Sequence, residues 1–144
     1  MKLYTSYYYQ LRNFPPNLIA LNTTVWPPKY VKIGSKDARN VILIDCPPLK
    51  PGVECEGLCR GACNPKHPNN CEFLKVYYEQ LKRIDFKEFM AHLEKIGKNV
   101  EEKENLTDID FAFIVFESPR NPCSERYPIQ QWVRDNGVEI EEWR

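Results

Sequence analysis

The sequence lacks a long apolar segment and an excess of charge of either sign. Its longest continuous apolar run is Phe111–Phe116, whereas a membrane-spanning helix needs about 20 apolar residues. Lys and Arg total 20 and Asp and Glu total 20 in 144 residues, so the formal net charge is zero. General nucleic-acid coats and proteins that bind anionic membranes are usually basic, so the balance argues against both. We expect no membrane partner.

The N-terminus also lacks the apolar core and the small-residue cleavage site of a signal peptide, since Met1–Tyr7 reads MKLYTSY. We therefore expect a cytoplasmic protein. Clustered thiols in that compartment are more often metal ligands or redox groups than structural disulfides. Disulfides remain the alternative, because the chain has six cysteines.

Strand-like segments and helical stripes alternate along the chain. Residues that favour strands are followed by proline-containing breaks in the first third, and the run Phe111–Phe116 is typical of a strand covered on both faces. A first helix is predicted from Cys71, and a second from a capping pair, Asp85 and Glu88, to Gly97. The predicted strands are Lys2–Tyr9, Leu18–Val25, Val41–Ile44, Phe111–Phe116 and Val138–Trp143.

Ile129, Trp132 and Val133 give the apolar stripe of a last helix, which Gly137 ends. Strand, crossover helix and strand in succession indicate a parallel sheet with helices on its faces. We expect residues 1–144 to form a single compact α/β domain, mostly parallel sheet flanked by helices. An irregular Cys-rich loop, residues 46–71, is inserted in it, and residues 100–105 are predicted to be a solvated connection.

The Cys-rich loop has neither helical nor strand periodicity. A structureless loop of this length is rare inside a compact domain unless something organises it, and a bound metal is the organiser we expect. The predicted ligands are Cys55, Cys59, Cys63 and Cys71, with His67 and Cys46 in reserve.

Thiolates suit zinc or an iron–sulfur cluster, and four of them complete either site. The three-residue gaps are unusual for zinc and match neither common ferredoxin pattern. We expect zinc, with a [4Fe-4S] cluster as the alternative. Four protein ligands close the coordination shell, which favours a structural role for the metal.

A second candidate site is the segment Cys123-Ser124-Glu125-Arg126, between a buried strand and a helix. Ligands of open α/β sheets bind beyond the carboxyl ends of strands. A helix N-terminus and Arg126 would lower the pKa of the Cys123 thiol, as a nucleophile requires. Arg126 would equally hold a phosphate or a carboxylate, and Glu117 is a candidate acid or base. The plainer alternative is that Cys123 is a small core residue and Arg126 an ion-pair member.

Several short segments, in order along most of the chain, resemble a known family. They are Tyr4–Tyr7, Pro27–Tyr30, Ile84–Phe89 and a closing segment with Glu117, Pro119, Cys123, Arg126, Trp132, Gly137, Val138 and Glu139. Together they are similar to the prokaryotic and phage domain-of-unknown-function family 488. That family carries Cys-His-Arg where this chain has Cys123-Ser124-Glu125-Arg126, so the His is missing here.

The resemblance implies a compact α/β fold and no settled activity. It also implies that Tyr4, Thr5, Ser6, Cys123 and Arg126 belong to one pocket, while the four-Cys loop would be the elaboration of a subgroup. Our main hypothesis is a metal-binding α/β domain that holds a phosphate-bearing ligand, such as a nucleotide or a nucleic-acid end, near Arg126. One alternative is a non-catalytic, metal-stapled module that binds protein or nucleic acid. The other is an iron–sulfur redox enzyme.

Overall fold

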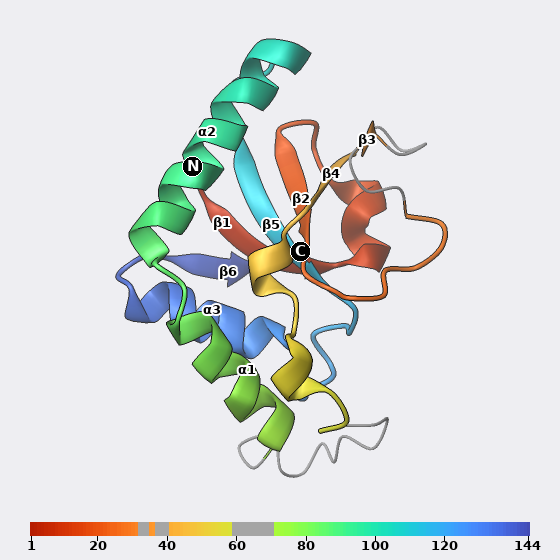
Figure 1. The fold of residues 1–144 in the computed structure, drawn as a ribbon. Helices are drawn as coiled ribbons and strands as arrows, with labels where there is room; N and C mark the ends of the chain where they lie inside the picture. Colours follow the sequence, from red (N-terminus) through yellow and green to blue (C-terminus); the bar gives the residue numbers. More distant parts are fainter. Residues whose placement is uncertain (32–34, 37–40, 59–70) are drawn as a thin grey trace.

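A six-stranded sheet forms the centre of the molecule (Figure 1). The computed structural model describes residues 1–31, 35–36, 41–58 and 71–144. In chain order the elements, with η marking a 3-10 helix, are β1 (Leu3–Tyr7), η1 (Tyr8–Asn13), β2 (Leu18–Asn22), β3 (Ser35–Lys36), β4 (Ile42–Asp45), η2 (Pro47–Leu49), η3 (Val53–Cys55), α1 (Glu72–Lys82), α2 (Phe86–Glu104), β5 (Asp110–Val115), α3 (Arg126–Asp135) and β6 (Ile140–Glu142).

The strands lie in the order β3-β4-β2-β5-β1-β6. Every pair from β4 to β6 is parallel, and β3 runs antiparallel to β4. The prediction of a single α/β fold with a mostly parallel sheet flanked by helices is therefore confirmed. Among the strands in the described residues, only β3 lies outside the predicted ones.

Helices cover both faces of this sheet. α1, α2 and α3 lie on one face and η1 lies on the other (Figure 1). The side chains of β5 point alternately to the two faces of the sheet. Phe111 and Phe113 pack with the α-helices. Ala112 and Ile114 pack with η1. All four are fully buried. The continuous apolar run of β5 thus marks a doubly covered strand, as predicted, and each buried Phe contributes about 1.5–3 kcal/mol of hydrophobic stabilisation.

The predicted cap of the second helix is confirmed, and its predicted end is wrong. The Asp85 carboxylate accepts a hydrogen bond from the Glu88 backbone N–H at 3.1 Å. α2 then continues through Gly97 to Glu104, so residues 100–105 are not a solvated connection. Gly97 is buried against the sheet, and a Cβ built on it would lie 3.7 Å from atoms of Ile109 and Phe111. Gly97 thus lies inside α2 and faces the sheet, and it does not end the helix.

Two further boundaries differ from the predictions. β1 ends at Tyr7, because the Tyr8 ring turns into the apolar cluster on the η1 face and its hydroxyl donates to Asn22. β2 likewise ends at Asn22. In the described ranges, no helix combines the length and the apolar composition that crossing a membrane requires.

The described part of the Cys-rich loop is fastened to α1 by hydrogen bonds. The Gln80 side chain accepts from the Gly52 backbone N–H at 2.7 Å and donates to the Lys50 carbonyl at 2.7 Å. The Tyr77 hydroxyl donates to the Leu49 carbonyl at 2.5 Å. Two polar side chains of α1 and two short 3-10 turns therefore order residues 46–55.

Candidate functional site

The strands β2 and β5 are neighbours whose chains leave the sheet in opposite directions. After β2 the chain runs towards β4, whereas after β5 it passes through α3 and beyond β1 to β6. In open α/β sheets such a divergence opens a crevice at the carboxyl ends of the two strands, and ligands bind there. The fold thus directs attention to the residues that follow Asn22 and Val115.

A pocket of about 500 Å³ lies at this point, within the size range of small-molecule sites. The loops after β2, β4 and β5 line it, together with the starts of α1 and α3. Its lining residues are Thr24, Val25, Trp26, Pro51, Gly52, Val53, Cys55, Glu56, Phe73, Phe116 and Glu125. We call it the aromatic–carboxyl pocket.

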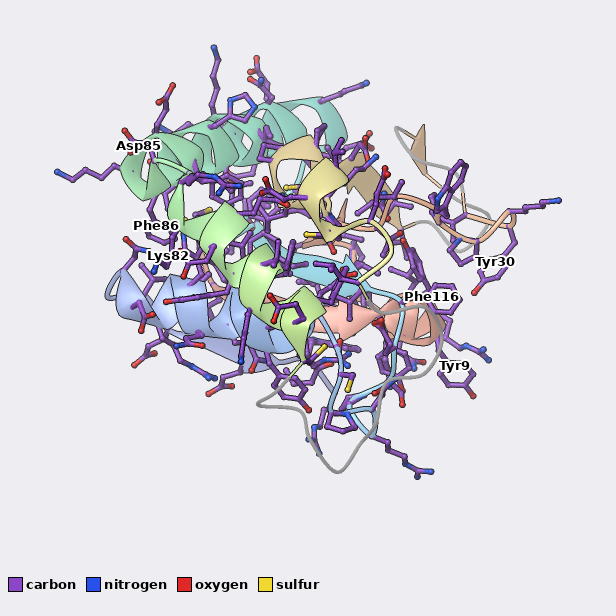
Figure 2. All side chains as sticks on the ribbon, turned by 60° about the horizontal axis from the view of Figure 1, so that its bottom comes forward. Tyr9, Tyr30, Lys82, Asp85, Phe86 and Phe116 are labelled. Carbon is purple, nitrogen blue, oxygen red and sulfur yellow. The ribbon has the colours of Figure 1, made fainter. Side chains whose placement is uncertain are left out.

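Aromatic rings dominate one part of the aromatic–carboxyl pocket. Trp26 is 86% exposed and Phe116 is 62% exposed, although Phe116 directly follows the buried strand β5. Figure 2 shows Phe116 on the same side of the molecule as Tyr9 and Tyr30. Exposed large apolar groups that gather around a cavity are typical of a binding surface.

Glu125, the residue before α3, supplies a buried carboxyl group of the pocket. Its Oε2 atom is buried and has no hydrogen-bond partner among the described residues. Burial, with a smaller contribution from the nearby Glu117 carboxylate, raises the pKa of Glu125 from 4.5 to about 8. The Glu125 carboxyl is therefore mostly neutral at pH 7, where it can donate a hydrogen bond or a proton.

Glu125 interacts electrostatically with several other acidic groups. Its charge acts on Tyr8 of η1, Cys55 of η3 and Tyr77 of α1, and Glu117 acts on it from the loop after β5. Burial also raises the pKa of Glu117, whose Oε2 accepts a long hydrogen bond of 3.4 Å from the Ser124 hydroxyl. An introduced positive charge would therefore be stabilised here.

A polar network fixes the ends of β2 and β4 beside the pocket. Asn22 accepts a hydrogen bond from the Tyr8 hydroxyl and donates to the Asp45 carboxylate at 3.0 Å. Lys50 pairs with Asp45 at 2.8 Å, and this contact helps to lower the pKa of Asp45. The network satisfies its buried polar groups, so it stiffens the strand ends without requiring a ligand.

Arg126, the predicted anion-binding residue, is buried and paired. Its guanidinium donates to both carboxylate oxygens of Glu142, at 2.8 and 3.2 Å. The predicted pocket residue Thr5 belongs to the same cluster, because its hydroxyl donates to Glu142 at 2.8 Å and accepts from Gln130 at 2.7 Å. A phosphate could reach Arg126 only by replacing Glu142.

The remaining predicted pocket residues lie apart from this cluster. Tyr4 packs with the η1-face cluster and lines another pocket, beside Gly137–Glu141. Ser6 is fully buried, and its hydroxyl has no hydrogen-bond partner in the part of the chain that the structure describes. Cys123 is disulfide-bonded, so a nucleophilic role would first require reduction of that bond.

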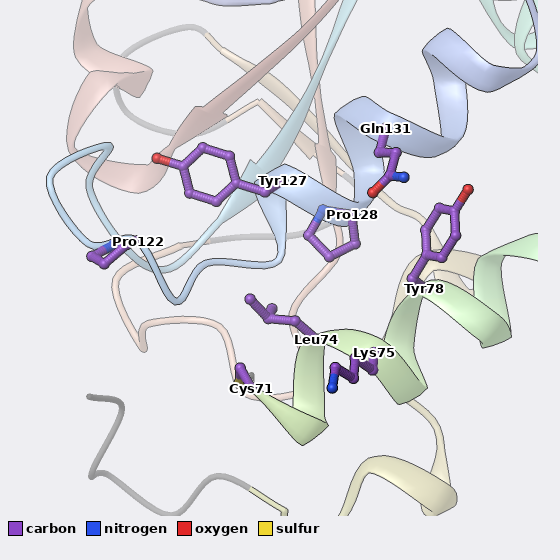
Figure 3. A pocket seen from close by; sticks show the side chains of 8 residues that line it. All are labelled: Cys71, Leu74, Lys75, Tyr78, Pro122, Tyr127, Pro128 and Gln131. Atoms are coloured by element: carbon purple, nitrogen blue, oxygen red, sulfur yellow. The ribbon is translucent and has the colours of Figure 1, made fainter. Parts of the chain in front are cut away.

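Of the predicted metal ligands, the structure describes Cys55 and Cys71, and both are free thiols. Cys55 is buried in the wall of the aromatic–carboxyl pocket. Cys71 lines a different pocket, of about 440 Å³ between α1 and α3 (Figure 3). Cys59, Cys63 and the reserve ligand His67 lie outside the described residues.

Within residues 1–31, 35–36, 41–58 and 71–144, no three His, Cys, Asp or Glu side chains are grouped as a metal site would require. The reserve ligand Cys46 is a core residue, and burial raises the pKa of its thiol to about 12, which disfavours the thiolate that binds metal. Zinc and the [4Fe-4S] alternative both stay predictions.

Sequence reasoning did not identify the main residues of the aromatic–carboxyl pocket. Glu125 lies inside the candidate segment Cys123-Ser124-Glu125-Arg126, but the sequence predicts roles only for its neighbours Cys123 and Arg126. The sequence predicts Phe116 as the last residue of a buried strand. The sequence does contain an indication for Trp26. This large aromatic residue lies directly before Pro27-Pro28, just after a predicted strand, and therefore in a loop at a strand end.

Comparison with known proteins identifies no relative that shares this site. No family model, curated protein or solved structure matches the chain. The resemblance to family 488 accordingly stays a prediction, and the structure establishes the class of the fold: an α/β domain with a parallel sheet.

Proposed function

We propose that this domain binds a small organic cation, an amine with an apolar body, in the aromatic–carboxyl pocket. The observation that carries the proposal is the composition of the pocket wall. It combines the rings of Trp26, Phe73 and Phe116 with the carboxyl groups of Glu56 and Glu125, and no Lys or Arg is among the described residues that line it.

Both kinds of group attract a cation. An ammonium group over an aromatic face gains about 0.5–2 kcal/mol, depending on how far it is removed from water. The Glu125 carboxyl has a buried oxygen without a hydrogen-bond partner among the described residues, and a positive charge in the pocket would favour the ionised form of this carboxyl. The apolar body of the ligand would cover ring surface that is now exposed to water.

Binding of a cation is expected to release a proton. Glu125 is neutral at pH 7, because its pKa is raised to about 8, and a positive charge beside it favours the ionised form. The affinity should therefore increase from pH 6 to pH 8 and level off above pH 8, where Glu125 is ionised before the ligand arrives.

The probe is benzyltrimethylammonium, whose charge does not depend on pH, and its neutral counterpart is benzyl alcohol. Calorimetry at pH 7 in two buffers of different ionisation heat measures affinity and proton release together. We expect Glu125→Gln to abolish proton release and to weaken cation binding by about 10-fold, equivalent to about 1.4 kcal/mol. Phe116→Ala should weaken it by about threefold or more.

The matched control is Tyr127→Ala, which removes an exposed ring that lines the pocket between α1 and α3. It should leave cation binding unchanged. Equal affinity for benzyl alcohol, or unchanged cation affinity in Glu125→Gln, would contradict the proposal.

A further inference from the structure

A second cavity at the same edge of the sheet has the opposite electrostatic character. It measures about 520 Å³ and lies where three neighbouring strands end. Tyr7 closes β1, Ser118–Arg120 follow β5, and Trp143 and Arg144 follow β6. Its lining residues are Tyr7, Gln10, Ser118, Pro119, Arg120, Trp143 and Arg144. We call it the arginine pocket.

The two arginines of this pocket are free to bind a ligand. Arg120 and Arg144 are exposed, and neither guanidinium is in an ion pair within the described part of the chain. No Asp or Glu is among the described residues that line the pocket. The carboxylate of Glu142, which is close in sequence, is already held by Arg126 at 2.8 Å. Two guanidinium groups without a described ion-pair partner around one cavity attract an anion.

The aromatic rings of the arginine pocket are held in place by neighbouring rings. Trp143 packs edge-to-face on Phe14, with ring centroids 4.8 Å apart, and its backbone N–H donates to the Thr5 carbonyl at 2.8 Å. Tyr7 stacks on Tyr9 with centroids 6.3 Å apart. A ring that is ordered before binding costs little conformational entropy when a planar ligand stacks on it.

We propose that the arginine pocket binds a small phosphate monoester that carries a planar ring. Guanidinium groups match phosphate oxygens with paired, charge-assisted hydrogen bonds. The Ser118 hydroxyl and the Gln10 amide are further donors in the wall, and the rings of Tyr7 and Trp143 line it beside them. The sequence predicts a phosphate site at Arg126, whereas this proposal places the phosphate at Arg120 and Arg144.

The test is calorimetry with phenyl phosphate and with inorganic phosphate at low ionic strength. We expect phenyl phosphate to bind more tightly than inorganic phosphate, because only the ester has a ring to stack. Arg120→Gln and Arg144→Gln should each weaken binding about 10-fold, and the double variant should bind neither probe measurably. Higher salt should weaken the wild-type interaction.

The matched control is Lys95→Gln, which removes one positive charge from the exposed side of α2. It should leave both affinities unchanged. Equal affinities for phenyl phosphate and inorganic phosphate, unchanged affinity in the double variant, or binding of a single-stranded oligonucleotide but not of phenyl phosphate would each overturn the proposal.

The proposal is independent of the cation site. The double Arg variant should retain its affinity for benzyltrimethylammonium, and Glu125→Gln should retain its affinity for phenyl phosphate. Circular dichroism of each variant separates loss of a site from loss of the fold.

Discussion

Arg126 and Glu142 form a buried, doubly hydrogen-bonded ion pair that joins α3 to the edge strand β6. The Arg126 side chain is 1% exposed and that of Glu142 is 11% exposed. The Thr5 hydroxyl of β1 donates to the same carboxylate. The pair therefore connects the start of α3 with β6 and, through Thr5, with β1. Its geometry is that of a structural clamp.

Breaking this pair should be costly. Glu142→Gln leaves the Arg126 guanidinium buried without a counter-charge, and we expect the free energy of unfolding to fall by about 3 kcal/mol. The control is Glu141→Gln, an exposed residue of the same strand, which should change it by less than about 0.5 kcal/mol. Urea denaturation at pH 7 measures both, and equal stabilities of the two variants would contradict the clamp.

The sheet could be predicted from the sequence because burial on both faces leaves a direct signature. Phe111–Phe116 reads as uninterrupted apolar sequence, and its neighbours β1 and β2 are bounded by aromatic or proline-rich breaks. The Asp85 cap is equally local, since it depends on two residues three positions apart. Features that depend only on residues close together in the sequence, such as a strand buried on both faces or a helix cap, can therefore be predicted from the sequence.

The errors concern features that depend on distant contacts. The sequence predicts a helix end at Gly97, whereas the sheet residues Ile109 and Phe111 lie against it. It predicts a ligand-binding role for Arg126, because no local pattern indicates that Glu142 is its partner. The raised pKa of Glu125 comes from its burial in the folded protein and, to a smaller extent, from the Glu117 carboxylate in the loop after β5.

Glu125 should make the protein less stable as the pH rises. The pKa of its carboxyl is about 8 in the folded protein against 4.5 in the unfolded chain. Between these values the folded state keeps a proton that the unfolded state has lost, so increasing pH favours unfolding. The loss begins near pH 4.5, is complete above pH 8 and amounts to at most about 5 kcal/mol.

Glu125→Gln keeps a neutral group at this position and should remove that pH dependence. Urea denaturation at pH 5, 7 and 9 should show a growing advantage of the variant over the wild type. Glu56→Gln, at an exposed residue of the same pocket, is the control and should follow the wild-type profile. Parallel profiles for wild type and Glu125→Gln would show that Glu125 ionises freely in the folded protein.

The predicted metal can be tested without reference to activity. We expect protein purified without chelators to contain about one zinc ion per chain and to be colourless. Cys55→Ser should lower the zinc content, whereas Cys46→Ala should not, because Cys46 is a core residue. A brown protein that absorbs near ~400 nm would favour the iron–sulfur alternative, and a metal-free protein would contradict both.

Gly97 and Gly137 should respond in opposite directions to the same substitution. At Gly97, inside α2, a new methyl group would meet Ile109 and Phe111 at 3.7 Å, which is ordinary van der Waals contact. Gly97→Ala should therefore raise the free energy of unfolding by about 0.5–1 kcal/mol, since alanine loses less backbone entropy in a helix.

Gly137 has a φ of +82° and no atom within 4 Å of an added Cβ. Space is available there, but an L side chain is strained in this conformation, so Gly137→Ala should lower stability by about 1 kcal/mol. Thermal and urea unfolding of the two variants measure the difference. Destabilisation by Gly97→Ala would mean that α2 cannot accept even a methyl group against β5, and that the close approach itself is what glycine provides.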